Sequence, residues 1–506
     1  MAQELFNACE YLLDRRLAAG DGPRVALTGP AGEITYAELQ DRVCRAAAGL
    51  RALGLGPEQR VLMVMADSPR FVVLYLAALR IGAIPVPVST MLRAGGIADL
   101  LRDSRARFLA VTGEFAAVGQ TAAAPVPGIR VLGEAEFDEL ASAAPDESVY
   151  DSGPDTPAFW LYTSGTTGVP KAAMHRHGSV REVCETYGAQ VLGIGPGDRC
   201  LSAAKAFFAY GLGNSVLFPL SAGASAVLLP SPSRPDLIAD ASAKYGATLF
   251  FAGPTFFAGM LRAGLPGDAL GGVRLAASAG EALPASLYRR WTARFGVDIL
   301  DGIGMTETLH IFLSNRVGEV RPGTTGVAVP RYVLKLVDED SGEEITAPDR
   351  PGTLYVRGAS AATGYWSSYD ASRRVFQGEW LRTGDTYTRD ADGYYACLGR
   401  TGDMIKASGI WVSPMEVEER LLAHPAVSQA VVVAAADADG LEKPVAYVVL
   451  TEGATVTESE LIGHCREGLP SFKRPRAVVF TDGFPTTATG KIRRVELRQM
   501  AAEVLK

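Results

Sequence analysis

Residues 162–171 read YTSGTTGVPK and combine four Ser or Thr side chains, two glycines and one lysine. The apolar run FWL at residues 159–161 precedes them and predicts a buried strand, and we expect a helix to follow them. Glycines let the backbone bend so that N–H groups converge on anionic oxygens, while hydroxyl groups and a lysine add donors and positive charge. The segment therefore predicts a loop that binds the β- and γ-phosphates of ATP. Its candidate residues are Thr163, Ser164, Gly165, Thr166, Thr167, Gly168 and Lys171.

The spacing within this loop separates it from the other common phosphate-binding loop. A Walker A loop requires GxxxxGK[ST], but here the glycines lie at positions 165 and 168, and Lys171 is followed by Ala172. A P-loop NTPase is therefore excluded. A Gly/Ser/Thr-rich linker that binds nothing remains the alternative on this pattern alone.

Strand-like apolar runs alternate with helical patterns from about residue 59 to 112 and again after residue 195. This alternation is typical of parallel sheets covered by helices, so we predict two doubly wound α/β subdomains. Between about residues 325 and 400, short strands separated by Gly and Asp turns indicate a β-rich subdomain. We expect residues 1–400 to form a large N-terminal α/β domain and residues 401–506 a small α+β domain.

The bulk composition is that of a globular protein, with 506 residues, a formal net charge of −7 and 48% hydrophobic residues. The acidic balance argues against a nucleic-acid partner, because attraction to phosphate backbones needs a basic surface. Six scattered cysteines without a CxxC pair indicate a reducing compartment, and no signal peptide or apolar run of membrane-spanning length is evident. We therefore expect a cytoplasmic monomer or homodimer without a membrane partner.

Five further segments follow the loop along the chain. They are SAGEALP at residues 278–284, GMTE at 304–307, LRTGD at 381–385, the stretch from GR at 399–400 through 409, and PTTATGK at 485–491. Together with YTSGTTGVPK they resemble, in order, the motifs of the adenylate-forming superfamily of acyl-CoA synthetases, luciferases and peptide-synthetase adenylation domains. This resemblance covers almost the whole chain. It implies that a carboxylic acid is activated as an acyl-adenylate, with ATP, Mg²⁺ and coenzyme A as the cofactors.

The resemblance implies three catalytic residues. Glu307 matches the family glutamate that holds Mg²⁺, and Thr306 matches the threonine that contacts the α-phosphate. Lys491 matches the lysine of a mobile C-terminal loop that bridges the carboxylate and the α-phosphate during adenylation. Outside this family, the Thr-Glu pair would be an ordinary helix start, whereas a lysine is disfavoured at such a position.

The resemblance also assigns the rest of the ATP site. Two segments match the backbone on either side of the adenine, and aliphatic Ile303 replaces the usual aromatic residue. Asp385 matches an aspartate that accepts both ribose hydroxyls, and Arg400 an arginine at the ribose; without the motifs they would be a turn aspartate and a surface arginine. The implied residues are Ser278, Gly280, Glu281, Asp301, Gly302, Ile303, Asp385 and Arg400.

In this family the small C-terminal domain rotates between two half-reactions. The pivot lies two positions after the arginine, which here is Gly402, and Asp403 could share it. Glycine permits large φ and ψ changes, so rotation remains possible. The segment SFKRPR at residues 471–476 matches CoA contacts of aryl-CoA ligases, although it would otherwise read as a solvated basic turn. The implied CoA-binding residues are Ser408, Gly409, Phe472, Arg474 and Arg476.

Two segments, KAFFAYGLGN at residues 205–214 and DGIGMTETLHIFLSN at 301–315, resemble benzoate–CoA ligases in particular. Small and apolar side chains there would enclose a flat ring, and His310 could hydrogen-bond a ring substituent or be a core histidine. The implied acid-binding residues are Ala209, Tyr210, Gly304, His310 and Ile311. His175 and His177 lack partnered ligands at metal spacing, so we assign them to positioning or structure.

The sequence thus predicts an ATP-dependent aryl acid–CoA ligase for benzoate or a substituted benzoate. One alternative is a stand-alone adenylation enzyme that loads an aryl acid onto a carrier protein, but the basic cluster at residues 472–476 favours CoA. Another is an inactive nucleotide-binding regulator. That alternative is disfavoured because Glu307, Asp385 and Lys491 are all present.

Overall fold

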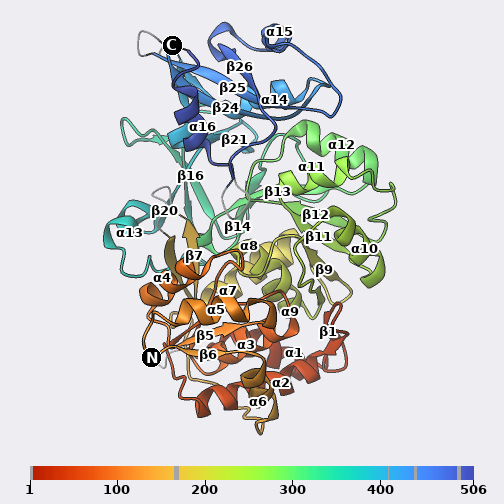
Figure 1. The fold of residues 1–506 in the computed structure, drawn as a ribbon, viewed down its shortest axis with the longest axis vertical. Coiled ribbons are helices and arrows are strands. Elements are labelled where there is room, and N and C mark those ends of the chain that lie inside the picture. The colour runs from red at the N-terminus through yellow and green to blue at the C-terminus, as the bar shows by residue number, and fades with distance from the viewer. Residues whose placement is uncertain (1–3, 165–169, 408–409, 438–440, 487–491, 506) are drawn as a thin grey trace. The chain divides into compact units, whose positions relative to one another are not determined.

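The computed structural model describes residues 4–164, 170–407, 410–437, 441–486 and 492–505 (Figure 1). The chain forms two compact units. The first comprises Met1–Leu283, Leu287–Leu334 and Val356–Leu381, and the second comprises Pro284–Ser286, Lys335–Tyr355 and Arg382–Lys506. The predicted class, mixed α/β with a large N-terminal part and a small C-terminal part, is confirmed. The predicted boundary between residues 400 and 401 stays a prediction.

The first unit contains a four-stranded parallel sheet in the order β4-β3-β5-β6. Its central strands are almost wholly buried, which explains their continuous apolar sequence. The strands are β3 (Arg60–Val64), β4 (Ile84–Pro87), β5 (Phe108–Val111) and β6 (Arg130–Leu132). The helices of this part are α1 (Arg15–Ala18), α2 (Tyr36–Ala52), α3 (Pro69–Arg80), α4 (Ala94–Ser104), α5 (Ala116–Ala123) and α6 (Glu134–Ser142).

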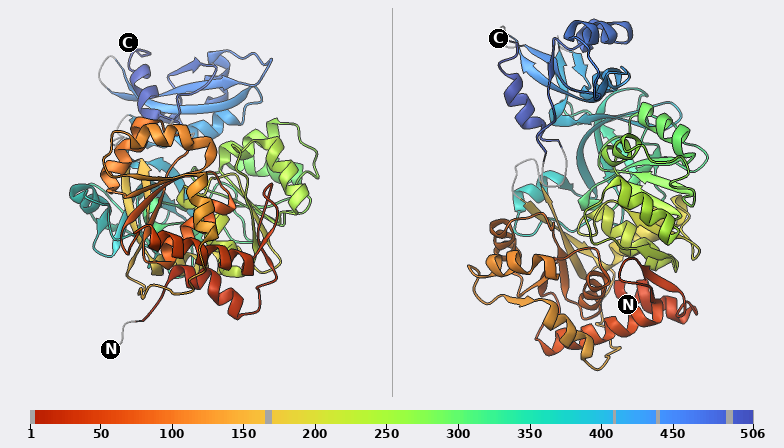
Figure 2. Two further views of the ribbon diagram at one scale, coloured as in Figure 1. Left: turned by 60° about the horizontal axis from the view of Figure 1, so that its bottom comes forward. Right: turned by 45° about the vertical axis from the view of Figure 1, so that its right-hand side comes forward.

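A nine-stranded sheet in the same unit has the order β15-β14-β13-β12-β11-β9-β10-β1-β2. Figures 1 and 2 show α10, α11 and α12 grouped on one side of its strands. The strands are β1 (Val25–Thr28), β2 (Ile34–Thr35), β9 (Arg199–Ser202), β10 (Ser225–Val227), β11 (Leu249–Ala252), β12 (Leu275–Ser278), β13 (Ile299–Gly304), β14 (Ile311–Ser314) and β15 (Val327–Ala328). The helices are α7 (His177–Val183), α8 (Ala209–Leu212), α9 (Phe218–Ala222), α10 (Pro235–Tyr245), α11 (Pro254–Arg262) and α12 (Ala285–Phe295).

One local prediction about the first unit is wrong. The segment after the phosphate loop is not a helix but strand β8 (Pro170–Arg176), which pairs antiparallel with β7 (Pro157–Ser164). Helix α7 begins only at His177. Cross-strand hydrogen bonds to β7 outweigh the helix preference of Ala172 and Ala173, because local propensity is a weak prior.

The second unit is built around the three-stranded sheet β24-β25-β26. Alternate residues of its strands face α14 and α15 on one side and α16 on the other (Figure 1). Its further strands form antiparallel pairs. The strands are β17 (Glu344–Ile345), β21 (Tyr395–Arg400), β22 (Ile405–Ala407), β23 (Ile410–Val412), β24 (Val427–Ala436), β25 (Glu442–Leu450) and β26 (Ala477–Phe480), and the helices are α14 (Pro414–Leu422), α15 (Glu458–Gly468) and α16 (Arg494–Ala501). Three strands have residues in both units: β16 (Val333–Val337), β18 (Gly352–Arg357) and β20 (Trp380–Arg389). Helix α13 (Tyr369–Val375) and strand β19 (Phe376–Gln377) belong to the first unit.

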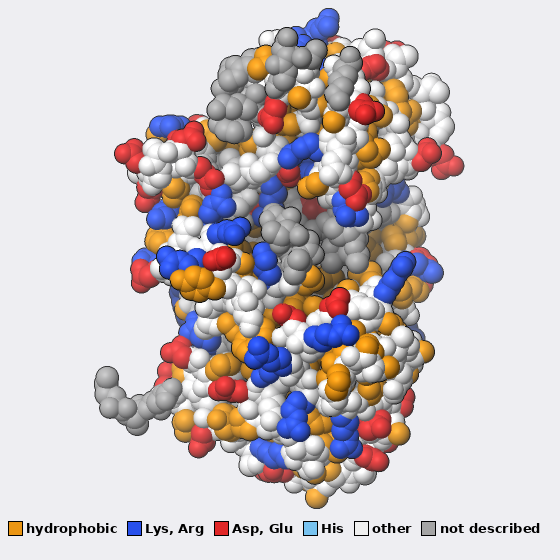
Figure 3. All heavy atoms as spheres, turned by 60° about the vertical axis from the view of Figure 1, so that its left-hand side comes forward, with side chains coloured by type: hydrophobic (Ala, Val, Ile, Leu, Met, Phe, Trp, Pro, Cys, Tyr) orange, Lys and Arg blue, Asp and Glu red, His pale blue; other side chains and the backbone are white. Residues whose placement is uncertain are grey.

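Charges of both signs are interspersed on the face drawn in Figure 3. In the described part of the chain, every helix is too short or too polar to span a membrane.

Candidate active site

The phosphate-loop prediction falls on a hairpin of the first unit. Thr163 lies opposite Lys171 in the β7–β8 register, so the two ends of the loop are held side by side. The ammonium group of Lys171 lies 5.8 Å from the ring centre of Tyr365. Residues 165–168 and the side chain of Ser164 lie outside the described part, so their predicted phosphate contacts stay predictions.

Thr306 and Glu307 lie in a single 3₁₀ turn, Thr306–Thr308, directly after β13. The Nε2–H group of His175 donates to the carbonyl oxygen of Thr306 at 2.8 Å. The hydroxyl group of Tyr365 donates to Oε1 of Glu307, and the amide of Ala362 donates to the carbonyl oxygen of Glu307 at 2.8 Å. The side chain and backbone of Glu307 are therefore both fixed by neighbouring residues, and the residue is buried.

The residues predicted to flank the adenine come from two adjacent parallel strands. Ser278 ends β12 and lies opposite Asp301 of β13. Gly280 has a φ of +96°, a left-handed conformation that favours glycine. Burial raises the pKa of the Asp301 carboxyl far above its usual range, and Oδ1 of this group has no hydrogen-bond partner among the described residues. The strand ends thus present unsatisfied polar groups, as expected where a polar ligand binds.

The residues predicted to bind the acid also lie together. Gly304 and Ile311 face each other across β13 and β14, and a Cβ atom on Gly304 would lie 2.6 Å from the carbonyl group of His310. The imidazole of His310 lies 5.3 Å from the ring of Tyr210, and its Nε2 lies 3.3 Å from the carbonyl oxygen of Tyr210. Tyr210 in turn donates its hydroxyl hydrogen to Ala277 at 2.8 Å. The predicted slot walls are therefore brought together, with Ala209 beginning helix α8 beside Tyr210.

His310 is a buried histidine, and its predicted contact with a ring substituent stays a prediction. It is buried among aromatic rings, with Phe218 at 4.5 Å and Tyr187 at 5.3 Å between ring centres. Burial lowers its pKa to about 3, so the ring is neutral near pH 7. Its Nδ1 atom has no hydrogen-bond partner among the described residues. The neutral ring therefore packs among aromatic side chains and keeps one polar atom without a partner among the described residues.

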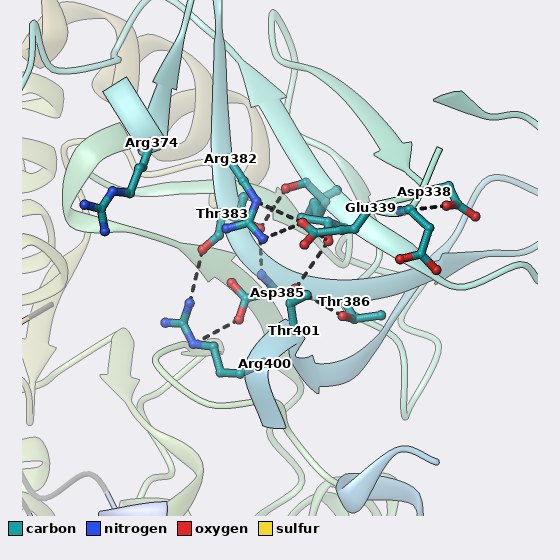
Figure 4. A network of polar contacts seen from close by, with 12 residues as sticks. Asp338, Glu339, Arg374, Arg382, Thr383, Asp385, Thr386, Arg400 and Thr401 are labelled. Atoms are coloured by element: carbon teal, nitrogen blue, oxygen red, sulfur yellow. Dashed lines mark hydrogen bonds and ion pairs between the residues drawn. The ribbon is translucent and has the colours of Figure 1, made fainter. Parts of the chain in front are cut away.

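The predicted ribose residues are partners in the second unit (Figure 4). Asp385 of β20 lies opposite Arg400 of β21, and Nε of Arg400 lies 3.2 Å from Oδ1 of Asp385. The Nη1 group of Arg400 also donates to the carbonyl oxygen of Thr383 at 3.1 Å. Asp385 and Arg400 thus lie on neighbouring strands, and both side chains can form hydrogen bonds with the two hydroxyl groups of a ribose.

The predicted CoA and hinge residues differ in their surroundings. Phe472 packs against the sheet core of the second unit, and Arg474 donates to the carbonyl oxygen of Leu469 at 2.8 Å, whereas Arg476 is exposed. The carbonyl oxygen of Gly402 accepts from Arg498 at 3.1 Å. Ser408, Gly409 and Lys491 lie outside the described residues.

Two further residues contact this site from distant parts of the chain, and the sequence analysis did not identify Tyr365 as one of them. Tyr365 bonds a glutamate 58 positions earlier in the chain, and His175 bonds a backbone oxygen 131 positions later. The sequence assigns His175 to positioning or structure, and the structure places its ring against the backbone of Thr306. Tyr365 had no local signal, because its neighbours resemble any aromatic segment of a β-rich region.

Buried histidines predict a pH dependence of stability. Burial lowers the pKa of His177 to about 4, well below the ordinary value of 6.5, so the unfolded chain binds the proton more readily than the folded one. Stability is therefore lost as the pH falls from 6.5 toward 4. Between pH 7 and pH 5, this residue should lower the free energy of unfolding by about 2 kcal/mol.

Urea unfolding of the wild type and of His177→Asn at both pH values checks this prediction. An asparagine oxygen can still accept from the amide of Ala8, which lies 3.0 Å from Nδ1 of His177. The variant should show a smaller stability difference between the two pH values. A stability difference between the two pH values that is the same in the variant and the wild type would contradict the attribution of this pH dependence to His177.

Comparisons with known proteins agree with this geometry. Residues 14–366 match the AMP-binding enzyme family, and residues 416–491 match the AMP-binding enzyme C-terminal domain. The benzoate–CoA ligase of Thauera aromatica is 43% identical over 98% of this chain and 96% of that protein. The crystal structure of a benzoate CoA ligase from Burkholderia xenovorans LB400 has a TM-score of 0.91 at 41% identity, covering 98% of this chain and 100% of that chain. The crystal structure of the anthranilate CoA ligase AuaEII in complex with anthranoyl-AMP has a TM-score of 0.93 at 36% identity, covering 99% of this chain and 98% of that chain.

The chain belongs to the AMP-binding enzyme family. The predicted enzyme class, an AMP-forming acid–CoA ligase, is confirmed by these relatives, as is the predicted resemblance to benzoate–CoA ligases.

Proposed function

We propose that this chain is an ATP-dependent aryl acid–CoA ligase whose acid is benzoate or a substituted benzoate. The observation that carries the proposal is the β13–β14 hairpin of the first unit. Gly304 ends β13 and Ile311 begins β14, while Thr306, Glu307 and His310 lie in the connection between the two strands. Gly304, His310 and Ile311 would wall a flat apolar slot for the ring of the acid. A ring bound in the slot would lie beside the groups that handle the phosphates.

In the first half-reaction, a carboxylate oxygen of the acid attacks the α-phosphorus of ATP and pyrophosphate leaves. Lys171, Thr163 and Thr306 bind phosphate oxygens, and Ile303 packs on the adenine against the segment of Ser278. In the second, the sulfur of CoA attacks the carbonyl carbon of the acyl-adenylate and AMP leaves. A mixed anhydride is already activated, so the protein supplies positioning and charge stabilisation rather than a nucleophile.

Glu307 is a suitable ligand for Mg²⁺. This ion is usually bound through one or two carboxylates together with substrate phosphates. The described residues contain no cluster of three or more His, Cys, Asp or Glu side chains that could hold a metal, so the nucleotide would supply the other ligands. When bound, Mg²⁺ would neutralise negative charge on the phosphate oxygens.

The C-terminal residues, 401–506, are proposed as a mobile domain that supplies Lys491 to the first half-reaction and CoA contacts to the second. A Cβ atom on Gly402 would meet no atom within 4 Å among the described residues, so sterics do not demand glycine in this conformation. The wide range of φ and ψ values open to glycine is consistent with a pivot at this position. The five cysteines that lie buried as thiols support a reducing compartment such as the cytoplasm.

A screen of pyrophosphate release and thioester formation tests the proposed function. Purified protein with ATP and Mg²⁺ is supplied with benzoates, cinnamates or short fatty acids, with and without CoA. Benzoates should give the highest kcat/KM, and CoA alone should accept the acyl group. Adenylation without transfer to CoA would favour the carrier-protein alternative, and no AMP from any aromatic acid would refute the proposal.

A further inference from the structure

Tyr365 contacts two residues of the proposed site at once. Its hydroxyl group donates to Oε1 of Glu307, and its ring lies 5.8 Å from the ammonium group of Lys171. No hydrogen bond from a described residue reaches the second carboxylate oxygen of Glu307. The hydrogen bond from the phenol therefore restricts the rotation of the Glu307 carboxylate. The second oxygen, Oε2, is left available to accept from or coordinate another group.

The backbone around Tyr365 is held on both sides. Along β8, the amide of Met174 donates to Gly364 at 3.0 Å, and the amide of Trp366 donates to Ala172 at 2.9 Å. Tyr365 itself forms a β-bridge with Ala173. On the other side, Ala362 bonds the backbone of Glu307. Because residues 362–366 are bonded to both β8 and the 3₁₀ turn, the backbone that carries the phenol is held beside the turn that carries the carboxylate.

Packing alone does not account for this hydroxyl group. The ring of Tyr365 packs edge-on against Phe376, with 5.3 Å between the ring centres, and phenylalanine would preserve that contact. The contact that requires the hydroxyl group is therefore its hydrogen bond to the Glu307 carboxylate.

We propose that Tyr365 is a positioning residue that orients the Glu307 carboxylate toward the metal–nucleotide complex. This inference rests on the proposed function of Glu307. Partners that orient metal ligands typically contribute 10- to 100-fold in metal affinity, so Tyr365→Phe should weaken the binding of the divalent cation by about 10-fold.

The test measures Mn²⁺ binding directly. Free Mn²⁺ is followed by electron paramagnetic resonance as it is titrated into the full-length protein with a non-hydrolysable ATP analogue. Adenylation of benzoate is measured in parallel against Mg²⁺ concentration. Tyr365→Phe should shift both curves to about 10-fold higher metal concentration, while the rate at saturating Mg²⁺ changes by less than about 3-fold.

Tyr36→Phe is the matched control. The hydroxyl group of Tyr36 is also buried and donates to the carbonyl oxygen of Ala224 at 2.7 Å, in another part of the first unit. It should leave both curves unchanged.

Glu307→Gln distinguishes the proposed metal role of Glu307 from the proposed positioning role of Tyr365. If this variant binds Mn²⁺ as the wild type does, the proposed metal role of Glu307 fails, and the inference fails with it. If Glu307→Gln weakens binding but Tyr365→Phe does not, only the inference is overturned. It is also overturned if Tyr365→Phe lowers the rate without shifting the metal dependence, or if Tyr36→Phe shifts the curves equally.

Discussion

Glu307→Gln is expected to lower the rate of benzoate adenylation by about 10²- to 10³-fold, the range seen when one preorganised group is removed from a transition state. The substitution removes the negative charge that suits a hard cation and keeps an amide oxygen that can accept from Tyr365. The fold should therefore persist while the developing phosphate charge is less well stabilised. Pyrophosphate exchange in the absence of CoA measures this half-reaction.

The control for this variant is Glu38→Gln, which removes a carboxylate from the capping box of α2. It should retain adenylation within about 2-fold, because surface and capping groups act on stability rather than on the site. Thermal unfolding of both variants shows whether folding is preserved. A fully active, folded Glu307→Gln protein would remove this residue from the chemistry.

Much of the fold was predictable because its strands are buried on both faces. The residues of β3 and β5 read as continuous apolar runs, and α3 begins with a Ser-Pro pair at residues 68 and 69 that marks a helix start. The same logic failed at residues 170–176, where strand pairing decides the structure. Local sequence preferences could not reveal that pairing.

The site was predictable only where it is local in sequence. Thr306, Glu307 and His310 lie within five residues, so one motif carries them. Tyr365 and His175 reach the same turn from distant segments, and only the folded chain shows their contacts. Leu309 also has a φ of +67°, a strained conformation for a non-glycine residue, which no sequence pattern indicates.

Lys491→Ala is expected to separate the two half-reactions. Adenylation should fall by about 10³-fold, because a positioned cation between the carboxylate and the α-phosphate acts only in that transition state. Thioester formation from supplied benzoyl-adenylate and CoA should remain within about 3-fold of the wild-type rate, since the activated anhydride no longer needs that cation. Single-turnover assays of each half-reaction give the comparison.

The described neighbours of Lys491 make the prediction specific to its side chain. Thr486 and Ile492 form a β-bridge, and Arg494 pairs with Glu418 at 2.7 Å, so both sides of residues 487–491 are fixed without this lysine. Removing the ammonium group should therefore leave the second unit folded. The exposed Arg493 lies two positions away and is the matched cation control. If Arg493→Ala impairs adenylation as strongly as Lys491→Ala, general positive charge rather than one positioned ammonium group drives the step. If Lys491→Ala slows both half-reactions equally, the lysine is not specific to adenylation and the prediction is wrong.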